Sequence, residues 1–289
     1  MGFSVIRRGG RQDRSPPGGV KGLLWRLVRF VALLYGALTV AACSMIDKAM
    51  FPVPTPRYLD QAPVFHVPKA DGGHLCVVQQ AATGQGVGDG WTILLSHGNG
   101  EDLGSVGRRL RVWSDQGFNV VAWDYSGYGR SSGEPSEEQL FADMEAMYKW
   151  LTEKHQISPK RLLLVGESLG GGPTTWIAAR EAVGAVVLRS TFTSVIAVKI
   201  AWPPLPGDKF PNLKYMKKIA APVLVAHGTE DRMIGPSHAR KLAATTAGPR
   251  RLHWFEGAGH NDTGRFIDDR FWESVAWVLE AADAESSDR

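Results

Sequence analysis

The sequence predicts an α/β fold with a mainly parallel, doubly wound sheet that carries helices on both faces. Short apolar runs of strand length alternate along the chain with amphipathic segments of helix length. This is the order expected when helices connect parallel strands. The run over residues 161–165 is almost wholly apolar, as a strand covered on both faces requires. The 33 Gly and 17 Pro among 289 residues supply turns for many short connections.

The composition excludes several other classes of protein. Hydrophobic residues make up 44% of the chain and charged residues 21%, which is close to a globular average and excludes disordered and collagen-like chains. Two cysteines cannot form a disulfide framework or a four-cysteine metal site. The net charge of +4 divides into +6 for residues 1–42 and −2 for the remainder. The basic residues therefore belong to a leader, and we expect no nucleic-acid partner.

Residues 1–42 are predicted to be a signal peptide or an N-terminal membrane anchor. The uncharged stretch FVALLYGALTVAA over residues 30–42 is too short to span a bilayer and has the length of a signal-peptide apolar region. It ends in Val-Ala-Ala-Cys, which resembles the lipobox of bacterial lipoproteins and implies that Cys43 is lipidated. The basic side stays in the cytoplasm under either interpretation. We therefore expect a membrane-anchored protein of the bacterial cell envelope, whose body faces the periplasm or the exterior.

Residues 43–63 are predicted to form a proline-rich tether, because MFPVPTPRYLDQAP from residue 50 contains four prolines and no periodicity. Residues 64–289 then form one domain. Ser136, with Gln139 three residues later, is typical of a helix N-terminus. Other predicted helices cover residues 103–116, 169–181 and 266–282. Predicted strands cover residues 92–96, 119–123, 161–165, 185–188, 223–226 and 252–255.

The interval over residues 191–218 interrupts this alternation and is too short for a second domain. It contains Trp-Pro-Pro-Leu-Pro-Gly at residues 202–207, so we expect a small flap that serves as a minimal lid. In open parallel sheets the ligand lies beyond the carboxyl ends of the strands, where this flap begins. Four apolar residues of the flap are candidates for lining an acyl slot, with ordinary packing as the alternative: Ile196, Ile200, Trp202 and Leu205.

The segment Gly-Glu-Ser-Leu-Gly, residues 166–170, follows the apolar strand and begins a helix. This is G-x-S-x-G in the context where it predicts a nucleophile, since the glycines permit a sharp turn that exposes the hydroxyl of Ser168. The alternative for an isolated motif of this kind is an ordinary glycine-rich turn. A second loop, His-Gly-Asn-Gly at residues 97–100, follows an earlier strand. The backbone N–H groups of Asn99 and Leu169 are expected to form an oxyanion hole.

Two further strand ends supply the acid and the base. Asp231 follows the strand over 223–226, with Glu230 as the alternative, and His260 follows the last strand. The chain order Ser168, Asp231, His260 is the order found in α/β-hydrolases. In this arrangement Ser168 is the nucleophile, His260 is the general base, and Asp231 orients the imidazole. His97 is expected to form structural hydrogen bonds rather than to act as the catalytic base.

No metal site or cofactor is expected, because no two histidines have the spacing of metal ligands. Cys76 lies in an apolar run and is expected to be a buried, inert thiol. The histidines at strand positions 227 and 253 are assigned to packing or hydrogen bonding. No candidate cluster surrounds the remaining histidines, namely His66, His74, His155 and His238.

The chain resembles the α/β-hydrolase superfamily over residues 91–265. It most resembles the branch of membrane-associated α/β-hydrolase-domain proteins that remove palmitate from protein cysteines, together with their bacterial relatives. The segments that carry the resemblance are LLSHGNGEDLG (94–104), WDYSGYGRSSGEPSEEQLFAD (123–143), ISPKRLLLVGESLGG (157–171), APVLVAHGTEDRMI (221–234) and EGAGHND (256–262). The resemblance implies the same triad and the same oxyanion donors.

The sequence therefore predicts a serine hydrolase that cleaves carboxylic ester or thioester bonds through an acyl-enzyme, as an exported, membrane-tethered monomer. A serine peptidase or amidase using the same triad is the alternative enzyme. A surface-anchored scaffold on an inactive hydrolase fold is the non-enzymatic alternative. Inactive relatives would be expected to have lost the serine or the histidine, and both are present here.

Overall fold

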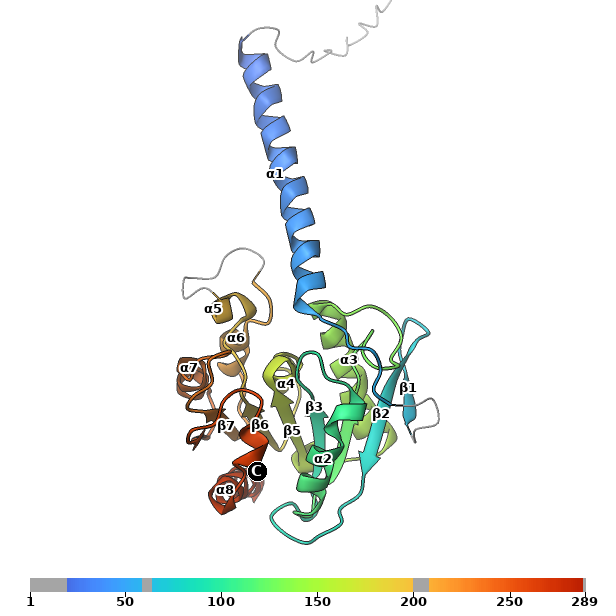
Figure 1. Cartoon of the computed structure of the whole chain (residues 1–289), viewed down its shortest axis with the longest axis vertical. Coiled ribbons are helices and arrows are strands. Elements are labelled where there is room, and N and C mark those ends of the chain that lie inside the picture. The colour runs from blue at the N-terminus through green and yellow to red at the C-terminus, as the bar shows by residue number, and fades with distance from the viewer. Residues whose placement is uncertain (1–19, 59–63, 200–207, 288–289) are drawn as a thin grey trace, which may run out of the picture. The chain divides into compact units, whose positions relative to one another are not determined.

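The computed structural model describes residues 20–58, 64–199 and 208–287 (Figure 1). The chain divides into two compact units, Met1–Ala49 and Met50–Arg289, which are described separately. The first unit contains helix α1, Val20–Met50, except for its last residue, and this helix includes the predicted apolar stretch and the backbone of Cys43. Its described apolar side chains are exposed, Leu23 and Leu33 among them. Within the described residues, no helix combines the length and apolar character needed to cross a membrane.

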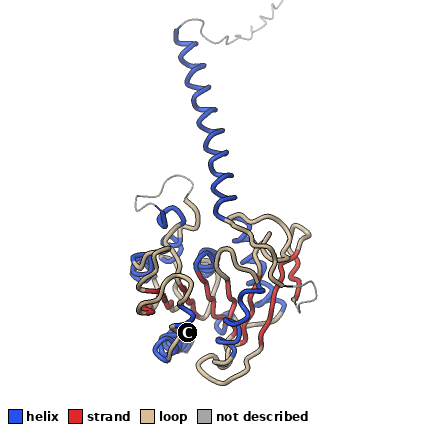
Figure 2. The backbone as a smooth tube through the Cα atoms, viewed as in Figure 1, coloured by secondary structure: helices blue, strands red, loops and turns tan. Residues whose placement is uncertain are grey.

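The second unit is built on one sheet, whose strands are red in Figure 2. Its described strands have the order β1-β2-β4-β3-β5-β6-β7-β8. β1 pairs antiparallel with β2, and β2 pairs antiparallel with β4. All other pairs are parallel, which confirms the predicted fold class. The strands are β1 Phe65–Pro68, β2 His74–Gln80, β3 Thr92–Ser96, β4 Asn119–Trp123, β5 Leu162–Glu167, β6 Ala185–Arg189, β7 Val223–Gly228 and β8 Arg250–Phe255.

Helices cover both faces of this sheet (Figure 1). Helices α2, Leu103–Ser114, and α8, Asp269–Ser287, pack on one face. The other face is covered by α3 Glu137–Lys149, α4 Gly171–Ala178, α6 Asn212–Met216 and α7 Ser237–Thr245. Every residue of β3, β5, β6 and β7 is buried, as expected for apolar strands that lie between two helical layers.

Local sequence explains where helix α3 begins. Ser136 caps α3, since its hydroxyl accepts a hydrogen bond of 3.0 Å from the backbone N–H of Gln139. The side chain of Gln139 donates instead to Asp143, at 2.8 Å. The predicted final helix begins at Asp269 rather than at residue 266, after a short 3-10 turn over Thr263–Arg265. Other short turns are Trp150–Lys154, Pro159–Arg161 and Ser168–Gly170.

The proline-rich segment differs from the expected tether in two respects. Residues 43–50 belong to α1, and residues 51–58 are extended but bound to the domain. The side chain of Phe51 is buried in the core. The backbone N–H of Arg57 donates to Asp102 at 2.6 Å, and the Tyr58 hydroxyl donates to Asp124 at 2.6 Å. Residues 59–63 lie outside the described part of the chain.

The described part of the flap includes a short helix, α5 Val195–Lys199, and then α6. The backbone N–H of Val195 donates to the carbonyl of Lys209 at 3.0 Å, which joins the two ends of the flap. The candidate acyl-slot residues Ile200, Trp202 and Leu205 lie outside the described residues, as does the side chain of Ile196. Their role stays a prediction.

Candidate active site

Ser168 lies at the tip of β5, on a tight turn. Its φ of +50° is a left-handed conformation that non-glycine residues seldom adopt. Close packing explains the glycines on either side. A Cβ at Gly166 would lie 2.6 Å from the Thr174 hydroxyl oxygen, and one at Gly170 would lie 2.1 Å from the carbonyl oxygen of Ser96. The turn can therefore form only if residues 166 and 170 have no side chain.

Three side chains from three strand ends meet in one hydrogen-bonded chain. His260, after β8, has its Nε2 3.0 Å from the hydroxyl oxygen of Ser168. Its Nδ1 lies 2.7 Å from Oδ2 of Asp231, which follows β7. Glu230, the alternative acid, is exposed to solvent. The structure thus brings the three predicted residues together in the order serine, imidazole, carboxylate, an arrangement that can move a proton from the hydroxyl to the ring.

Asp231 is buried and held as an anion. Burial alone would raise the pKa of its carboxyl, but hydrogen bonds from His227, His260 and the backbone of Ile234 outweigh burial and lower that pKa. Its Oδ1 accepts the backbone N–H groups of Met233 at 2.9 Å and Ile234 at 2.8 Å. Oδ2 faces His260 and also lies 3.2 Å from Nε2 of His227, so both carboxylate oxygens have partners and the carboxylate is fixed in the orientation that the His260 imidazole needs.

A buried charge network lies directly behind the serine. Glu167 forms ion pairs with Arg109 and with Arg189. Burial would raise the pKa of this carboxyl, but the two guanidinium groups lower it to about 2. Arg109 also pairs with Glu101 at 2.9 Å, and Glu101 accepts the backbone N–H of Gly98 at 2.7 Å. The network therefore links the turn of the serine to the loop at residues 97–100.

This charge network was not predicted from the sequence. Two signals were available in the sequence: a glutamate precedes the serine, and an arginine ends the apolar strand over residues 185–188. Charged residues at the ends of buried strands are expected to have partners, because an unpaired buried charge is costly. The identity of those partners was decided by the tertiary structure.

The loop at residues 97–100 is held beside the serine. A Cβ at Gly98 would lie 3.7 Å from Cβ of Ser168. Both ends of the Asn99 side-chain amide are engaged: Oδ1 accepts from the Tyr128 hydroxyl at 2.6 Å, and Nδ2 donates to the Met50 carbonyl at 2.5 Å. Among the described residues no acceptor takes the backbone N–H of Asn99 or of Leu169. Both N–H groups are thus available to an oxyanion.

His97 helps to hold this loop in place. Its ring is fully buried, and Nδ1 lies 2.8 Å from the carbonyl oxygen of Gly98. Nε2 lies 3.4 Å from Oδ1 of Asp124, and the ring packs on Tyr125 with centroids 4.2 Å apart. These partners match the structural role preferred for His97 from the sequence.

A cavity of about 560 Å³ adjoins the serine and His260. Its wall is mixed in character. Apolar atoms come from Val112, Trp113, Met233 and Ile267. Two exposed arginines, Arg108 of α2 and Arg265 after β8, also line it, and neither has an ion-pair partner among the residues that the structure describes. The cavity therefore offers both apolar surface and free positive charge to a ligand.

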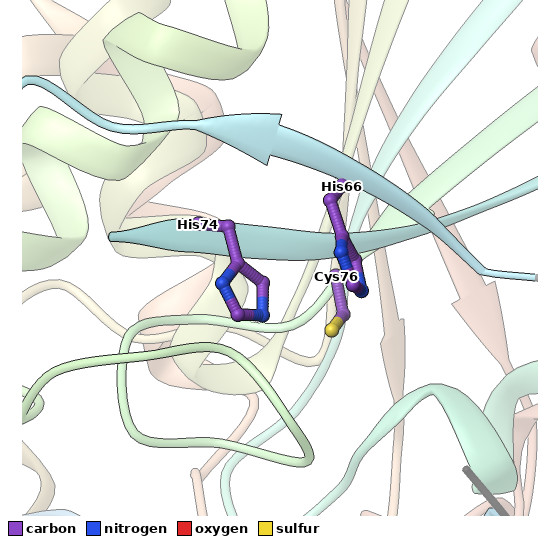
Figure 3. A group of neighbouring side chains, drawn as sticks. All are labelled: His66, His74 and Cys76. Atoms are coloured by element: carbon purple, nitrogen blue, oxygen red, sulfur yellow. The ribbon is translucent and has the colours of Figure 1, made fainter. Parts of the chain in front are cut away.

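The predictions for the two cysteines and for His66 and His74 have different outcomes. The side chain of Cys43 lies outside the described residues. Cys76 is buried, as expected, and its thiol is free within the part of the chain that the structure describes. The expectation that no cluster surrounds His66 and His74 was wrong, because strand pairing brings both beside Cys76 (Figure 3). The reason is that pairing between strands creates ligand proximity that spacing along the chain does not reveal.

Comparison with known proteins places the chain in a family. A family model described as "Serine aminopeptidase, S33" matches residues 90–218. The Alpha/beta hydrolase domain-containing protein 17B of Xenopus laevis is 41% identical over 197 residues, which cover 65% of this chain and 67% of that relative. The chain belongs to the α/β-hydrolase superfamily. The human protein 17B is also 41% identical, over 60% of this chain and 61% of its own length.

The predicted superfamily and its branch are thus confirmed. Mouse protein 17C is 41% identical over 60% of this chain. The matches to these curated relatives span between 55% and 67% of the relatives' own lengths. Among solved structures, a Pyrococcus furiosus esterase superposes with a TM-score of 0.62 at 17% identity, covering 79% of this chain and 98% of that one. A hydrolase from Pseudomonas aeruginosa gives 0.58 at 20% identity, over 76% and 99%. These two structural similarities show the fold alone.

Proposed function

We propose that this protein is a serine hydrolase that cleaves carboxylic esters or thioesters through an acyl-enzyme. The observation that carries the proposal is the continuous hydrogen-bonded chain from Ser168 through His260 to the buried, ionised Asp231. In a family of hydrolases, such a chain at the carboxyl ends of parallel strands supports nucleophilic catalysis.

The first half-reaction forms the acyl-enzyme. His260 Nε2 accepts the proton of the Ser168 hydroxyl as the oxygen attacks the acyl carbonyl carbon. The carbonyl π electrons move to its oxygen, which accepts hydrogen bonds from the backbone N–H groups of Asn99 and Leu169. Donors of this kind are worth about 3–4 kcal/mol each in comparable sites. When the tetrahedral intermediate collapses, the imidazolium gives its proton to the leaving alcohol or thiol.

The second half-reaction releases the acid. A water molecule takes the place of the leaving group, and His260 accepts its proton as the oxygen attacks the acyl carbon. The second tetrahedral intermediate expels Ser168 Oγ, which recovers its proton from the imidazolium. Asp231 stays ionised throughout and stabilises the charged ring.

The charge of the cavity favours substrates with an anionic leaving group. Arg108 and Arg265 line the cavity beside the serine and are free to pair with a ligand. Guanidinium groups bind phosphate with two parallel hydrogen bonds. The apolar part of the wall suits an acyl chain, and the two arginines suit a leaving group that carries phosphate.

A peptidase is the second candidate, and the description of the matching family model favours it. The same triad would then attack an amide bond, and the two arginines would face a carboxylate of the peptide. The non-catalytic scaffold is disfavoured, because the serine, histidine and aspartate are all present and connected.

The cellular setting belongs to the same proposal. We place the enzyme at the bacterial cell envelope, tethered to the membrane through its N-terminal unit, with Cys43 as the lipidated residue of a lipoprotein. The lipobox-like Val-Ala-Ala-Cys sequence and the concentration of positive charge before it support this placement.

The test is hydrolysis of p-nitrophenyl esters from acetate to palmitate by the full-length protein in detergent, together with labelling by a fluorophosphonate. We expect labelling and turnover in the wild type, with the preferred chain length reporting the acyl space. Turnover of peptide amides with no ester turnover would favour the peptidase. A folded protein that shows neither labelling nor any turnover would refute the serine hydrolase.

A further inference from the structure

Two histidines and a cysteine converge at the edge of the sheet, on strands β1 and β2. His66 lies directly opposite Cys76 in the antiparallel register, and His74 lies two residues before Cys76 on β2. Positions that are opposite each other or two apart on a strand point to the same face. Figure 3 shows both imidazole rings and the thiol on one side of the strand pair.

The three side chains are close enough to share one ion. One ligand atom from each residue lies within 4.8 Å of the other two. The two imidazole rings are 4.3 Å apart between centroids, inclined at 32°. In a tetrahedral zinc site, Zn–N distances of about 2.0–2.1 Å and Zn–S distances of about 2.3 Å place neighbouring ligand atoms roughly 3.3–3.6 Å apart. Side-chain rotations that move the ligand atoms by about an ångström would therefore bring the two imidazole nitrogens and the sulfur to binding distance.

The surroundings leave the two imidazoles available as ligands. Among the described residues, neither ring of the histidine pair has a hydrogen-bond partner. Cys76 is buried, with the hydroxyls of Tyr58 and Ser131 beside its thiol. His66 is exposed to solvent, so an ion can enter and a water molecule can complete its coordination. Two imidazoles and one thiol suit borderline and soft transition metals rather than Mg²⁺ or Ca²⁺, which prefer oxygen ligands.

We propose that His66, His74 and Cys76 form a site for a divalent transition metal ion, with Zn²⁺ as its occupant. The two imidazoles bind as neutral ligands and Cys76 binds as a thiolate, whose proton passes to solvent when the metal–sulfur bond forms. Water takes the fourth position. The metal would join the short edge strand β1 to β2, where main-chain pairing covers only four residues of β1.

Cobalt substitution tests this site directly. Untagged, chelator-treated full-length protein in detergent is titrated with Co²⁺, and absorption is followed in the near-ultraviolet region of thiolate-to-cobalt charge transfer. We expect one Co²⁺ per chain, a charge-transfer band, and displacement of the cobalt by Zn²⁺. Cys76→Ser should remove the band. His66→Ala should weaken binding by about tenfold or more, since even outer-shell changes cost that much in metal sites.

The control is His155→Ala, which removes an exposed histidine that packs on Trp150 and does not belong to the cluster of His66, His74 and Cys76. This variant should bind cobalt as the wild type does. His66→Ala is the decisive variant if Cys76→Ser fails to fold, because His66 is exposed. A wild type without the charge-transfer band, or equal affinities for wild type and His66→Ala, would overturn the site. Ester hydrolysis is not part of the readout, so the result is independent of the proposed function.

Discussion

His260 Nδ1 lies 2.7 Å from Oδ2 of Asp231, while the other oxygen of that carboxylate is occupied by two backbone N–H groups. Oδ2 is thus left for the two imidazoles, with His227 Nε2 farther away at 3.2 Å, and it accepts from His260 Nδ1. His260 is therefore held as the tautomer that carries its proton on Nδ1, and Nε2 is free to accept the proton of Ser168. The geometry yields predictions for each member of the chain.

Ser168→Ala should abolish hydrolysis and fluorophosphonate labelling. The loss of the nucleophile is expected to lower kcat by roughly 10⁴–10⁶-fold, as in comparable triads. The side chain is partly exposed and only its oxygen is removed, so thermal unfolding should be nearly unchanged. Turnover that persists in a well-folded variant would sink the assignment of the nucleophile.

Asp231→Asn should lower kcat by about 10⁴-fold with little effect on KM, because the amide favours the wrong tautomer of His260. The exposed neighbour provides a matched control. Glu230→Gln removes a carboxylate one residue away that makes no contact with the imidazole, and its kcat should equal that of the wild type. The reverse result would move the acid to Glu230.

Glu167→Gln should destabilise the fold by about 3–5 kcal/mol, because it leaves Arg109 and Arg189 without their shared buried carboxylate. The pKa of Glu167 falls from 4.5 to about 2 on folding. Its contribution to stability is therefore complete above pH 4.5 and is lost as the pH falls toward 2. Urea unfolding measured between pH 2 and pH 5 should show that the free energy of unfolding falls more steeply with decreasing pH in the wild type than in the variant. Parallel declines would contradict the lowered pKa.

The free arginines should discriminate between leaving groups. Arg108→Ala and Arg265→Ala are each expected to raise KM by about two- to fivefold for an acyl-coenzyme A, whose leaving thiol carries phosphates, since exposed ion pairs are worth up to about 1 kcal/mol. KM for p-nitrophenyl acetate should not change. Arg270→Ala, an exposed arginine that does not line the cavity, is the control. Equal effects on both substrates would argue against recognition of charge.

Cys43→Ala tests the lipoprotein. Lipidation should be lost, and the protein should leave the membrane fraction or accumulate with its leader uncleaved. Incorporation of radiolabelled palmitate and membrane fractionation report the two effects. Unchanged membrane retention in the variant would favour an uncleaved N-terminal anchor instead.

Much of the site was predictable because its signals are local. The turn at Ser168 needs glycines on both sides, and these are neighbours in the sequence. Asp231 and His260 each follow a strand that its apolar run identifies. Since parallel strands place their carboxyl ends at one edge of the sheet, residues 63 and 92 positions from the serine were expected beside it. This inference does not require the order of the strands in the sheet to be known.

The sequence by itself determined the α/β class, the parallel strands and the three side chains that the structure brings together, Ser168, Asp231 and His260, because periodicity, glycine turns and strand ends are properties of short segments. Only the tertiary structure decided which charges neutralise Glu167, that the proline-rich segment packs through Phe51, and that His66 meets His74 and Cys76. These contacts depend on strand register and on the path of a connection. Both are set by the free energy of packing the whole domain, which no short segment encodes.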